Sequence, residues 1–527
     1  MMRNWRVVSG RGAAIFCPGA WDAMGRCDFR LTAARVASSC TVMWDRGRRT
    51  SIAILSLALM LPGCGGGGDA PSGFAGVPPT TPTPSPSPGT GQCSLRARQD
   101  WAFAQMREWY LFPETLPASL DPAPYATLLD YVDALTAEAR AQGKDRYFTY
   151  VTSIAEEDAY YDSGESAGFG VRLQYDEAAG RVFVAEAFEG TAALAAGLDR
   201  GAEILAIGET TASLRDVSDI MASEGSIGVS DALGPSTAGT TRALRIRDTA
   251  GERVITMTKT DYDLTPVSSR YGARVIEEGG RRIAYVNLRT FIDPADPALR
   301  SAFAGFRAQG IDEVIVDLRY NGGGLVSIAR VLGNLLGGNR STSDIFARLR
   351  HRPEKSGEDE THRFAPQSQS VSPRRIAFIA TGDTASASEM VINAMLPYLH
   401  ADVALIGDNS YGKPVGQIAL DQPACDDRLR LIAFSVENGA GQGSYFEGLA
   451  PYMDATCRAD DDIDHPLGDP QEASIRQAID WLGGATCTPI PTMTNQSTLR
   501  IEAAPQKPRL LMPAAPTTPQ REVPGSF

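Results

Sequence analysis

The feature that most constrains the fold is an alternation of apolar, strand-like runs with helical patterns across the second half of the chain. Strands are predicted at 283–288, 313–318, 376–380, 403–406 and 429–436, and helices at 297–307, 326–336 and 387–399. Strands connected through helices pair in parallel, because each helix returns the chain to the same edge of the sheet. Residues 261–490 are therefore predicted to form an α/β domain with a largely parallel sheet.

Two smaller folded regions are predicted before this domain. In residues 93–165 apolar side chains recur at helical spacing, which indicates a small helical domain. Residues 166–260 read as strand, short helix, glycine turn and apolar strand, an order that resembles a β-rich PDZ domain. In such a domain a glycine loop presents backbone amides to the carboxylate of a bound peptide. The resemblance implies that the following residues bind that carboxylate: Gly168, Phe169, Gly170 and Val171.

Two further segments have compositions that do not favour folding. Residues 65–92 are glycines followed by a Pro/Thr/Ser tract, and residues 491–527 are Pro-rich and polar. Such segments bury too little apolar surface to fold. The first is predicted to be an extended linker and the second a disordered tail.

Residues 1–64 carry signals of export. The apolar stretch 51–63 is too short to span a bilayer comfortably and follows three arginines, a pattern typical of a signal peptide. It ends in Leu-Pro-Gly-Cys64, which resembles a bacterial lipobox and implies that Cys64 is lipidated; translation is then expected to start at Met43. The expected location is the bacterial cell envelope, lipid-anchored and facing the periplasm, and the glycine at position 65 permits sorting to the outer membrane. The alternative is a short buried helix with an incidental cysteine.

The charge distribution argues against nucleic acid as a partner. The chain has 50 basic and 63 acidic residues, and residues 1–63 hold nine of the arginines and three of the acids, which leaves 41 basic against 60 acidic residues. Such a surface repels phosphates, and no cluster of lysine and arginine interrupts it.

The cysteines beyond the leader predict disulfides. Four remain, and an even number in an exported chain favours two bonds with three possible pairings. We expect Cys425 to pair with Cys457, beside the candidate site, and Cys93 with Cys487. Metal binding is the weaker alternative, because the chain has no CxxC pair and only four histidines. No metal or organic cofactor is expected.

Three motifs that follow predicted strands hold the candidate catalytic residues, at the sheet edge where α/β proteins build their sites. The first is TGDTASASE at 381–389, which leads into a helix. Ser386 lies among unpaired amides at that helix N-terminus, and the Ala387 amide is a candidate oxyanion donor. Taken alone, Ser386 followed by Glu389 is also a capping box, which requires no catalysis.

The second motif, NSYGKPVGQ at 409–417, contains Lys413. A lone lysine in a loop is ordinarily a solvated surface charge. Burial among apolar neighbours disfavours the ammonium form, and a neutral Lys413 would accept the Ser386 proton. Gln417 would orient the amine by hydrogen bonding.

The third motif is DLRYNGGG at 317–324. Consecutive glycines at a strand end permit close approach of a ligand to the backbone, and the Gly324 amide is a second candidate oxyanion donor. The alternative is a glycine turn into the next helix, with Asp317 and Arg319 merely paired.

DLRYNGGG, TASASE and GKPVGQ in this order, behind a PDZ-like unit, resemble the carboxyl-terminal processing peptidases over residues 95–485. The resemblance implies a crotonase-like or ClpP-like α/β catalytic domain with Ser386, rather than Ser388, as nucleophile. It implies Lys413 as base, Gln417 as its orienting partner, and an oxyanion hole formed by the Gly324 and Ala387 amides. The implied reaction is hydrolysis of peptide bonds in exported proteins whose C-termini the PDZ-like unit captures.

The chain departs from the family pattern near the lysine. Pro414 stands where a glycine is usual and Gly416 where a valine is usual. The lysine follows the nucleophile by 27 residues, which implies an insertion between helix and strand. These changes alter the stiffness of the loop without removing a catalytic group. A Gly-x-x-Pro turn at 448–451 also resembles the family.

Two other functions are weighed against a peptidase. A catalytically inactive, PDZ-containing peptide-binding lipoprotein would have no need to keep Ser386, Lys413 and Gln417 together. A Ser-His-Asp esterase would use His400 or His465, but neither has the expected neighbours and no G-x-S-x-G elbow is present.

Overall fold

The computed structural model describes residues 91–492 and 507–527. The predicted signal peptide, the lipidation site Cys64 and nearly all of the predicted linker lie outside these ranges. Everything described belongs to one compact unit, Thr83–Phe527. In its described part, no helix combines the length and the apolar character needed to cross a bilayer.

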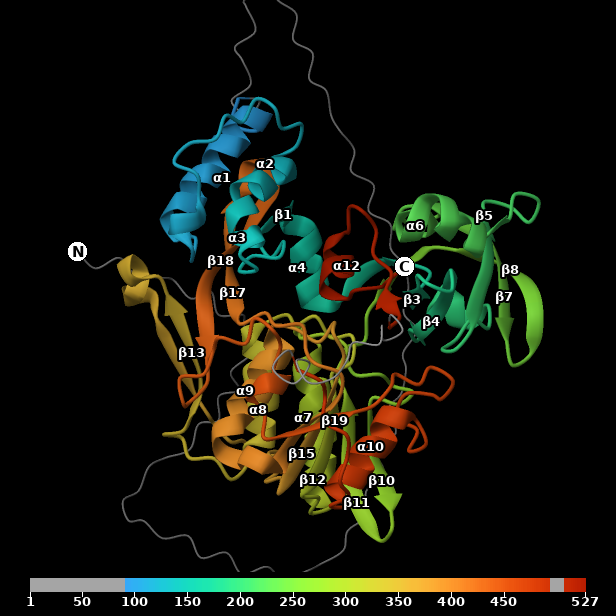
Figure 1. Cartoon of the computed structure of the whole chain (residues 1–527), viewed down its shortest axis with the longest axis vertical. Coiled ribbons are helices and arrows are strands. Elements are labelled where there is room, and N and C mark those ends of the chain that lie inside the picture. Colours follow the sequence, from blue (N-terminus) through green and yellow to red (C-terminus); the bar gives the residue numbers. More distant parts are fainter. Residues whose placement is uncertain (1–90, 493–506) are drawn as a thin grey trace, which may run out of the picture. The chain divides into compact units, whose positions relative to one another are not determined.

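The central sheet has the order β10-β11-β12-β15-β16-β19 (Figure 1). From β11 to β19 all neighbouring strands pair in parallel, and β10 forms an antiparallel edge with β11. This confirms the predicted α/β fold with a largely parallel sheet. The bounds are β10 Ala273–Glu278, β11 Arg281–Asn287, β12 Glu313–Asp317, β15 Arg375–Ala380, β16 Val403–Gly407 and β19 Ala455–Arg458.

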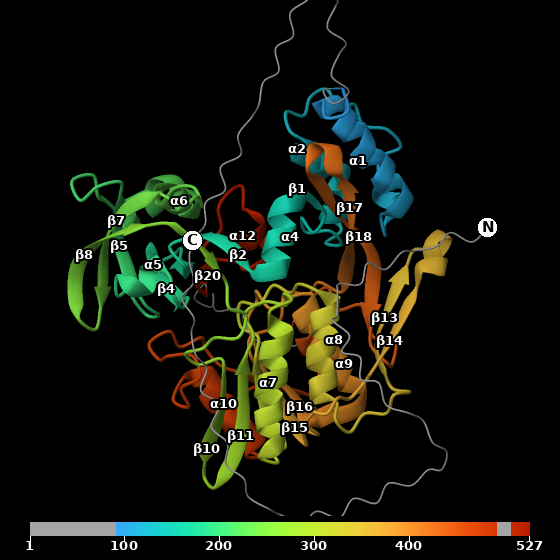
Figure 2. The same cartoon turned by 180° about the vertical axis from the view of Figure 1, so that it is seen from behind.

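Helices cover both faces of the central sheet (Figures 1 and 2). Alternate strand residues point to opposite faces, so Val314 and Val316 join one core while Ile315 joins the other. The first core also holds α7 (Ala295–Ala308), α8 (Val326–Leu336) and α9 (Ala387–Leu399). The second holds α10 (Ala473–Leu482). Strands buried on both faces explain the continuous apolar runs in the sequence.

A second sheet, order β1-β18-β13-β14 with β17 paired to β18, is antiparallel. The predicted strand 429–436 belongs here rather than to the central sheet, because it forms a hairpin with β17. The bounds are β1 Tyr150–Ser153, β13 Ile345–His351, β14 Glu360–Arg363, β17 Val415–Gln422 and β18 Asp427–Glu437.

The predicted N-terminal helices form but do not make a separate core. They are α1 (Leu95–Trp109), α2 (Leu128–Leu135), α3 (Ala137–Ala141) and α4 (Ile154–Ser163). Met106 and Tyr131 from these helices share one hydrophobic cluster with Leu429 and Leu431 of the β17–β18 hairpin. The helical region is therefore completed by the hairpin that follows Lys413.

A third sheet contains the region predicted to be β-rich. Its order is β20-β3-β4-β5-β7-β8, with β6 paired to β5, and a separate pair β2-β9 flanks it. The strand bounds are β2 Glu165–Gly168, β3 Val171–Asp176, β4 Arg181–Ala187, β5 Glu203–Gly208, β6 Arg215–Asp216, β7 Thr241–Asp248, β8 Gly251–Thr258, β9 Thr260–Asp263 and β20 Arg509–Leu510. Helices α5 (Ala192–Ala195) and α6 (Val217–Leu233) accompany them.

The prediction of a disordered tail is wrong for residues 507–527. This segment supplies β20, which pairs with β3, and α12 (Thr518–Glu522), which contacts α4. Average composition concealed a few apolar residues that the fold buries, including Leu511, Val523 and Phe527. Residues 493–506 lie outside the described ranges.

The predicted disulfide pairing is also wrong, although all four cysteines are bonded. Cys93 pairs with Cys425 and Cys457 with Cys487. The turn of the β17–β18 hairpin carries Cys425 to the start of α1, and Cys487 follows α10, which packs on the sheet beside β19. Packing between distant segments decides both pairs, which spacing along the chain does not encode.

Candidate active site

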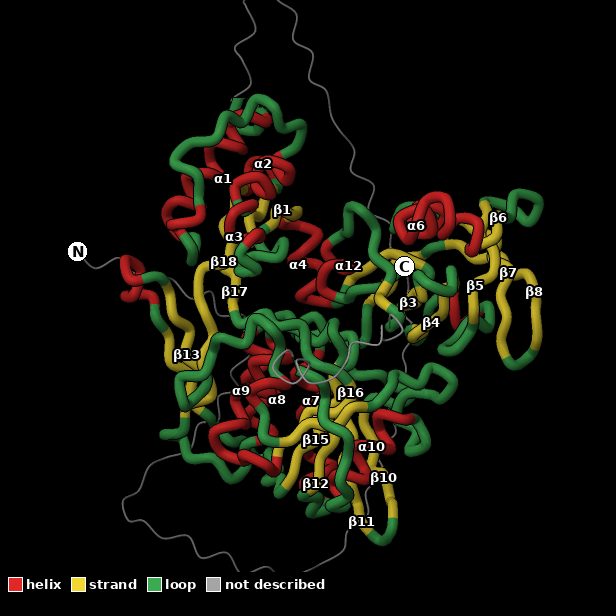
Figure 3. The backbone as a smooth tube through the Cα atoms, in the orientation of Figure 1, coloured by secondary structure: helices red, strands yellow, loops and turns green. Residues whose placement is uncertain are grey.

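Three loops converge at one edge of the central sheet (Figure 3). They follow β12, β15 and β16, which are adjacent and parallel. Parallel neighbours place their carboxyl ends at the same edge, so the three predicted motifs meet there although they are far apart in the sequence.

Ser386 occupies a tight turn between the loop after β15 and α9. Its φ angle is +54°, in the left-handed region that side chains rarely adopt. The strained turn is held by the DLRYNGGG loop: the Asn321 carbonyl accepts from the Ala385 amide at 3.0 Å and from the Ser388 hydroxyl at 3.1 Å. Ser388 is thus buried and engaged, while Ser386 is partly exposed.

The glycine loop lies directly against Ser386. A side-chain carbon at Gly323 would lie 2.8 Å from the Ser386 Cβ, and one at Gly324 would lie 2.4 Å from the Phe291 carbonyl oxygen. Both glycines have positive φ, so no other residue fits there without strain. Within the described residues, the Gly324 and Ala387 amides have no hydrogen-bond partner. Two free donors therefore lie in the loops around the hydroxyl.

Glu389 ties the serine turn to the lysine loop. It is fully buried, and its carboxylate accepts hydrogen bonds from the amides of Ser386 at 3.0 Å, Gly412 at 2.7 Å and Lys413 at 2.8 Å, and from the Ser410 hydroxyl at 2.6 Å. Burial raises the pKa of this carboxyl, although the four donors oppose the shift. The predicted capping interaction is present, because the Ser386 amide donates to the Glu389 carboxylate, but the sequence did not indicate that this carboxylate also binds the lysine loop.

The Lys413 amine lies in a half-buried setting beside Gln417. Its Nζ is 3.3 Å from Gln417 Oε1 and 4.9 Å from the centre of the Phe148 ring. The Gln417 amide in turn donates to the Phe148 carbonyl. Burial lowers the pKa of Lys413 below its ordinary value, while Glu522 and Asp145 act in the opposite direction. In the part of the chain that the structure describes, the amine bonds to Gln417 and not to the Ser386 hydroxyl, so that contact stays a prediction.

Two further residues support the lysine loop. Arg146 donates to the Tyr411 carbonyl at 3.1 Å and to the Gly412 carbonyl, which fixes the turn that precedes the lysine. Gly416, an unusual residue at its position, lies where a side-chain carbon would be 2.0 Å from the Phe434 ring. The ring fills the space of the missing side chain.

Comparison with known proteins agrees with this geometry. Residues 282–452 match the model of peptidase family S41, and this range contains all three motifs. The chain contains a peptidase S41 domain.

Relatives of the S41 domain include two curated proteins. The chloroplastic C-terminal processing peptidase of Tetradesmus obliquus is 26% identical over 279 residues, covering 49% of this chain and 54% of that protein. The carboxyl-terminal-processing protease of a Picosynechococcus strain is 23% identical over 261 residues, covering 50% and 58%. The chain spans about half the length of these curated relatives. An S41 protease structure from Bacteroides fragilis has a TM-score of 0.56 at 22% identity and covers 73% of this chain and 97% of its own, which shows a shared fold.

Other candidate residues lie outside the S41 loops or serve to hold them. Asp317 and Arg319 form a fully buried ion pair at 2.7 Å, which is the structural alternative that the sequence left open. His465 bonds to Asp462 at 2.7 Å. His400 lies in the turn after α9.

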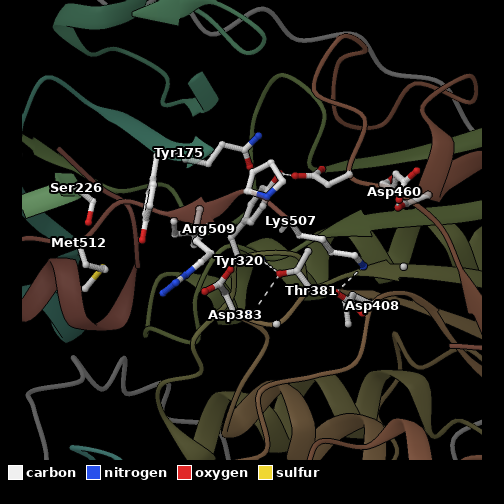
Figure 4. Close-up of a pocket in the computed structure, with 18 of the residues that line it drawn as sticks. Tyr175, Ser226, Tyr320, Thr381, Asp383, Asp408, Asp460, Lys507, Arg509 and Met512 are labelled. Atoms are coloured by element: carbon white, nitrogen blue, oxygen red, sulfur yellow. Dashed lines mark hydrogen bonds and ion pairs between the residues drawn. The ribbon is translucent and has the colours of Figure 1, made fainter. Parts of the chain in front are cut away.

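A cavity of about 710 Å³ adjoins the S41 loops on the side of the third sheet. It is lined by Tyr320 and Asp383 from two of the motifs, by Tyr175 of β3, and by Lys507 and Arg509 (Figure 4). Burial raises the pKa of Asp383 to about 6. The cavity does not include Ser386, so it is a neighbour of the site rather than the site itself.

The predicted carboxylate-binding loop, 168–171, connects β2 and β3. Its Gly170 and Val171 amides donate to the main-chain oxygen of Phe527 at 2.9 and 3.3 Å. The loop is thus occupied by the chain's own terminal segment.

Proposed function

We propose that the chain is a serine endopeptidase of the carboxyl-terminal processing type. The observation that carries this proposal is the buried Glu389, which joins the turn of Ser386 to the loop of Lys413. A surface cap would not need a carboxylate shared between two loops. The match of residues 282–452 to the peptidase family S41 model supports the same function.

In the proposed reaction, the Ser386 hydroxyl attacks the scissile carbonyl and transfers its proton to a neutral Lys413 amine. A C–O bond forms, and the Gly324 and Ala387 amides stabilise the oxyanion. The C–N bond then breaks as Lys413 returns the proton to the leaving amine. Water hydrolyses the acyl-enzyme by the same path in reverse. An oxyanion donor of this kind contributes about 3–4 kcal/mol to the barrier reduction.

The proposed substrates are exported proteins with accessible C-termini, bound by a PDZ-like unit through the 168–171 loop. The proposed setting is the cell envelope, with a lipid on Cys64 holding the enzyme at the membrane. The two curated relatives are both named for C-terminal processing, which supports the substrate class.

Labelling with a serine-reactive phosphonate, followed by peptide mapping, tests the nucleophile. We expect modification of Ser386 and hydrolysis of an unfolded protein that disappears in Ser386→Ala. Ser388→Ala is the matched control, because the Ser388 hydroxyl is engaged with Asn321 and its loss should affect stability rather than chemistry. Peptide binding without labelling or hydrolysis would favour an inactive peptide-binding protein instead.

A further inference from the structure

The edge of β3 is filled by the chain's own terminal segment. Phe527 donates its amide to the Val171 carbonyl at 2.9 Å, and the Leu173 amide donates to the Gly525 carbonyl at 2.8 Å. With the two bonds to the Phe527 oxygen, these contacts make residues 525–527 an antiparallel addition to β3. Figure 1 shows this end of the chain beside β3.

The terminal side chain is buried in a pocket suited to an aromatic ring. Phe527 is 2% exposed and shares a hydrophobic cluster with Phe169, Val171 and Val229. The buried Lys259 amine lies 6.0 Å from the centre of the Phe527 ring and 5.0 Å from that of Phe169. A cation near two ring faces favours aromatic occupants over aliphatic ones. We call this site the β3 groove: the 168–171 loop, the edge of β3 from Val171 to Leu173, and this pocket.

Upstream, the same segment reaches the catalytic loops. A side-chain carbon at Gly322 would lie 3.2 Å from the Glu522 carbonyl oxygen and 3.5 Å from the Pro524 ring. The Tyr150 hydroxyl donates to the Glu522 carboxylate at 3.2 Å. That carboxylate also acts electrostatically on the Lys413 amine. The six residues 522–527 thus connect the glycine loop of the candidate site to the β3 groove.

A bound substrate would follow this same path, with its C-terminus in the groove and its upstream residues at Ser386. We propose that residues 522–527 are an internal competitor that occupies the substrate path, and that proteins ending in an aromatic residue displace it. The catalytic part of this inference rests on the proposed function, whereas occupancy of the groove does not.

The attachment of residues 522–527 to helix α12 makes this competition effective. Helix α12 is anchored by a hydrogen bond between Thr518 and Thr152 and by the Thr518 amide to Glu156 at 3.0 Å. Only the few residues after α12 need to leave the groove. A segment tethered so closely has an effective concentration of about the millimolar range. A free peptide present at micromolar concentration would compete poorly until the segment is weakened.

Binding of a labelled peptide with the sequence of residues 521–527 tests the groove in a Ser386→Ala background. We expect the Phe527→Ala protein to bind this peptide about tenfold or more tightly than the protein with an unaltered terminal segment, because the internal competitor is weakened. Ala515→Ser, at an exposed position of the same tail, should leave binding unchanged. A peptide ending in alanine should bind Phe527→Ala about tenfold more weakly than the one ending in phenylalanine.

A second variant tests the inference independently if Phe527→Ala does not fold. Gly525 has a φ of +84°, and a side-chain carbon there would lie 2.9 Å from the Leu173 carbonyl oxygen, so Gly525→Ala should also expel the segment. Thermal unfolding identifies which variant is folded. Equal peptide affinity in the folded variant and the parent overturns the inference.

Hydrolysis of an unfolded protein that ends in phenylalanine separates this inference from the proposed function. With Ser386 intact, Phe527→Ala should raise the rate at low substrate concentration about threefold or more, because more of the enzyme has a free groove. Hydrolysis at the same rate in both proteins, with equal peptide affinity, contradicts the competitor and leaves the peptidase standing. Tighter peptide binding by Phe527→Ala, with no hydrolysis by either protein, supports the internal competitor and contradicts the peptidase.

Discussion

The Glu389 carboxylate accepts a hydrogen bond from the Lys413 main-chain amide at 2.8 Å, across 24 residues of sequence. Its same oxygen accepts from the Ser386 amide. One buried acid therefore holds the two loops that carry the candidate nucleophile and base, and their relative position depends on it.

Glu389→Gln should loosen this arrangement. A glutamine offers one acceptor oxygen and turns an N–H₂ group toward a donor, so at least one buried amide loses its partner at about 1–3 kcal/mol. We expect the free energy of unfolding to fall by about 1–3 kcal/mol. The rate of hydrolysis should fall about tenfold to a hundredfold, because small displacements of the reacting groups slow the reaction strongly. Glu354→Gln, at an exposed position, is the control. Unchanged hydrolysis in Glu389→Gln would remove this residue from the positioning of the site.

The pH dependence of hydrolysis should report on Lys413. The base acts when neutral, so kcat/KM should rise with pH through the lysine pKa, which burial holds below its ordinary value of 10.5. The Glu522 carboxylate stabilises the ammonium form and raises this pKa. Glu522→Gln should therefore shift the rising limb to lower pH, and a shift to higher pH would contradict the assignment of Lys413 as base.

Arg200→Ala should destabilise the contact between the third sheet and the S41 domain. Arg200 is buried and pairs with Asp461 at 2.9 Å and with the Tyr320 hydroxyl at 3.0 Å. Removing one partner of a buried pair costs about 3 kcal/mol. Arg215→Ala, whose partner Glu224 is exposed, should cost less than about 1 kcal/mol. Thermal unfolding of both variants measures the difference.

The difference in stability between the Arg200→Ala and Arg215→Ala variants should depend on pH. Burial alone would raise the pKa of Asp461, but Arg200 and Arg319 hold it below its ordinary value of 3.8. The stabilisation by the carboxylate is therefore present above pH 3.8 and is lost as pH falls below it. We expect the two variants to converge in acid, and a constant gap would show that the packing of Arg200, rather than its charge, matters.

Disulfide mapping under non-reducing conditions should recover Cys93 with Cys425 and Cys457 with Cys487. Replacing both cysteines of the first pair with alanine should lower stability by about 2–5 kcal/mol, because that bond closes a loop of 332 residues. A peptide linking Cys425 to Cys457 would contradict the structure and restore the pairing expected from the sequence.

Local pattern was sufficient for most elements of the central sheet. The predicted helix 387–399 coincides with α9, and the predicted strand 313–318 differs from β12 by one residue. The periodicity of hydrophobic residues and the continuous apolar runs are properties of residues close together in the chain, so they can be recognised directly in the sequence. Strand 429–436 was located correctly but assigned to the wrong sheet, because its partner β17 is chosen by a hairpin and not by its own residues.

The sequence by itself determined the α/β alternation, the three motifs and the resemblance to the carboxyl-terminal processing peptidases, because each depends on residue order alone. Tertiary structure alone decided the cysteine partners, the shared role of Glu389 and the folding of residues 507–527 onto β3. These depend on which distant segments meet. A few buried contacts such as Phe527 against the 168–171 loop outweigh the average polarity of the segment that carries them.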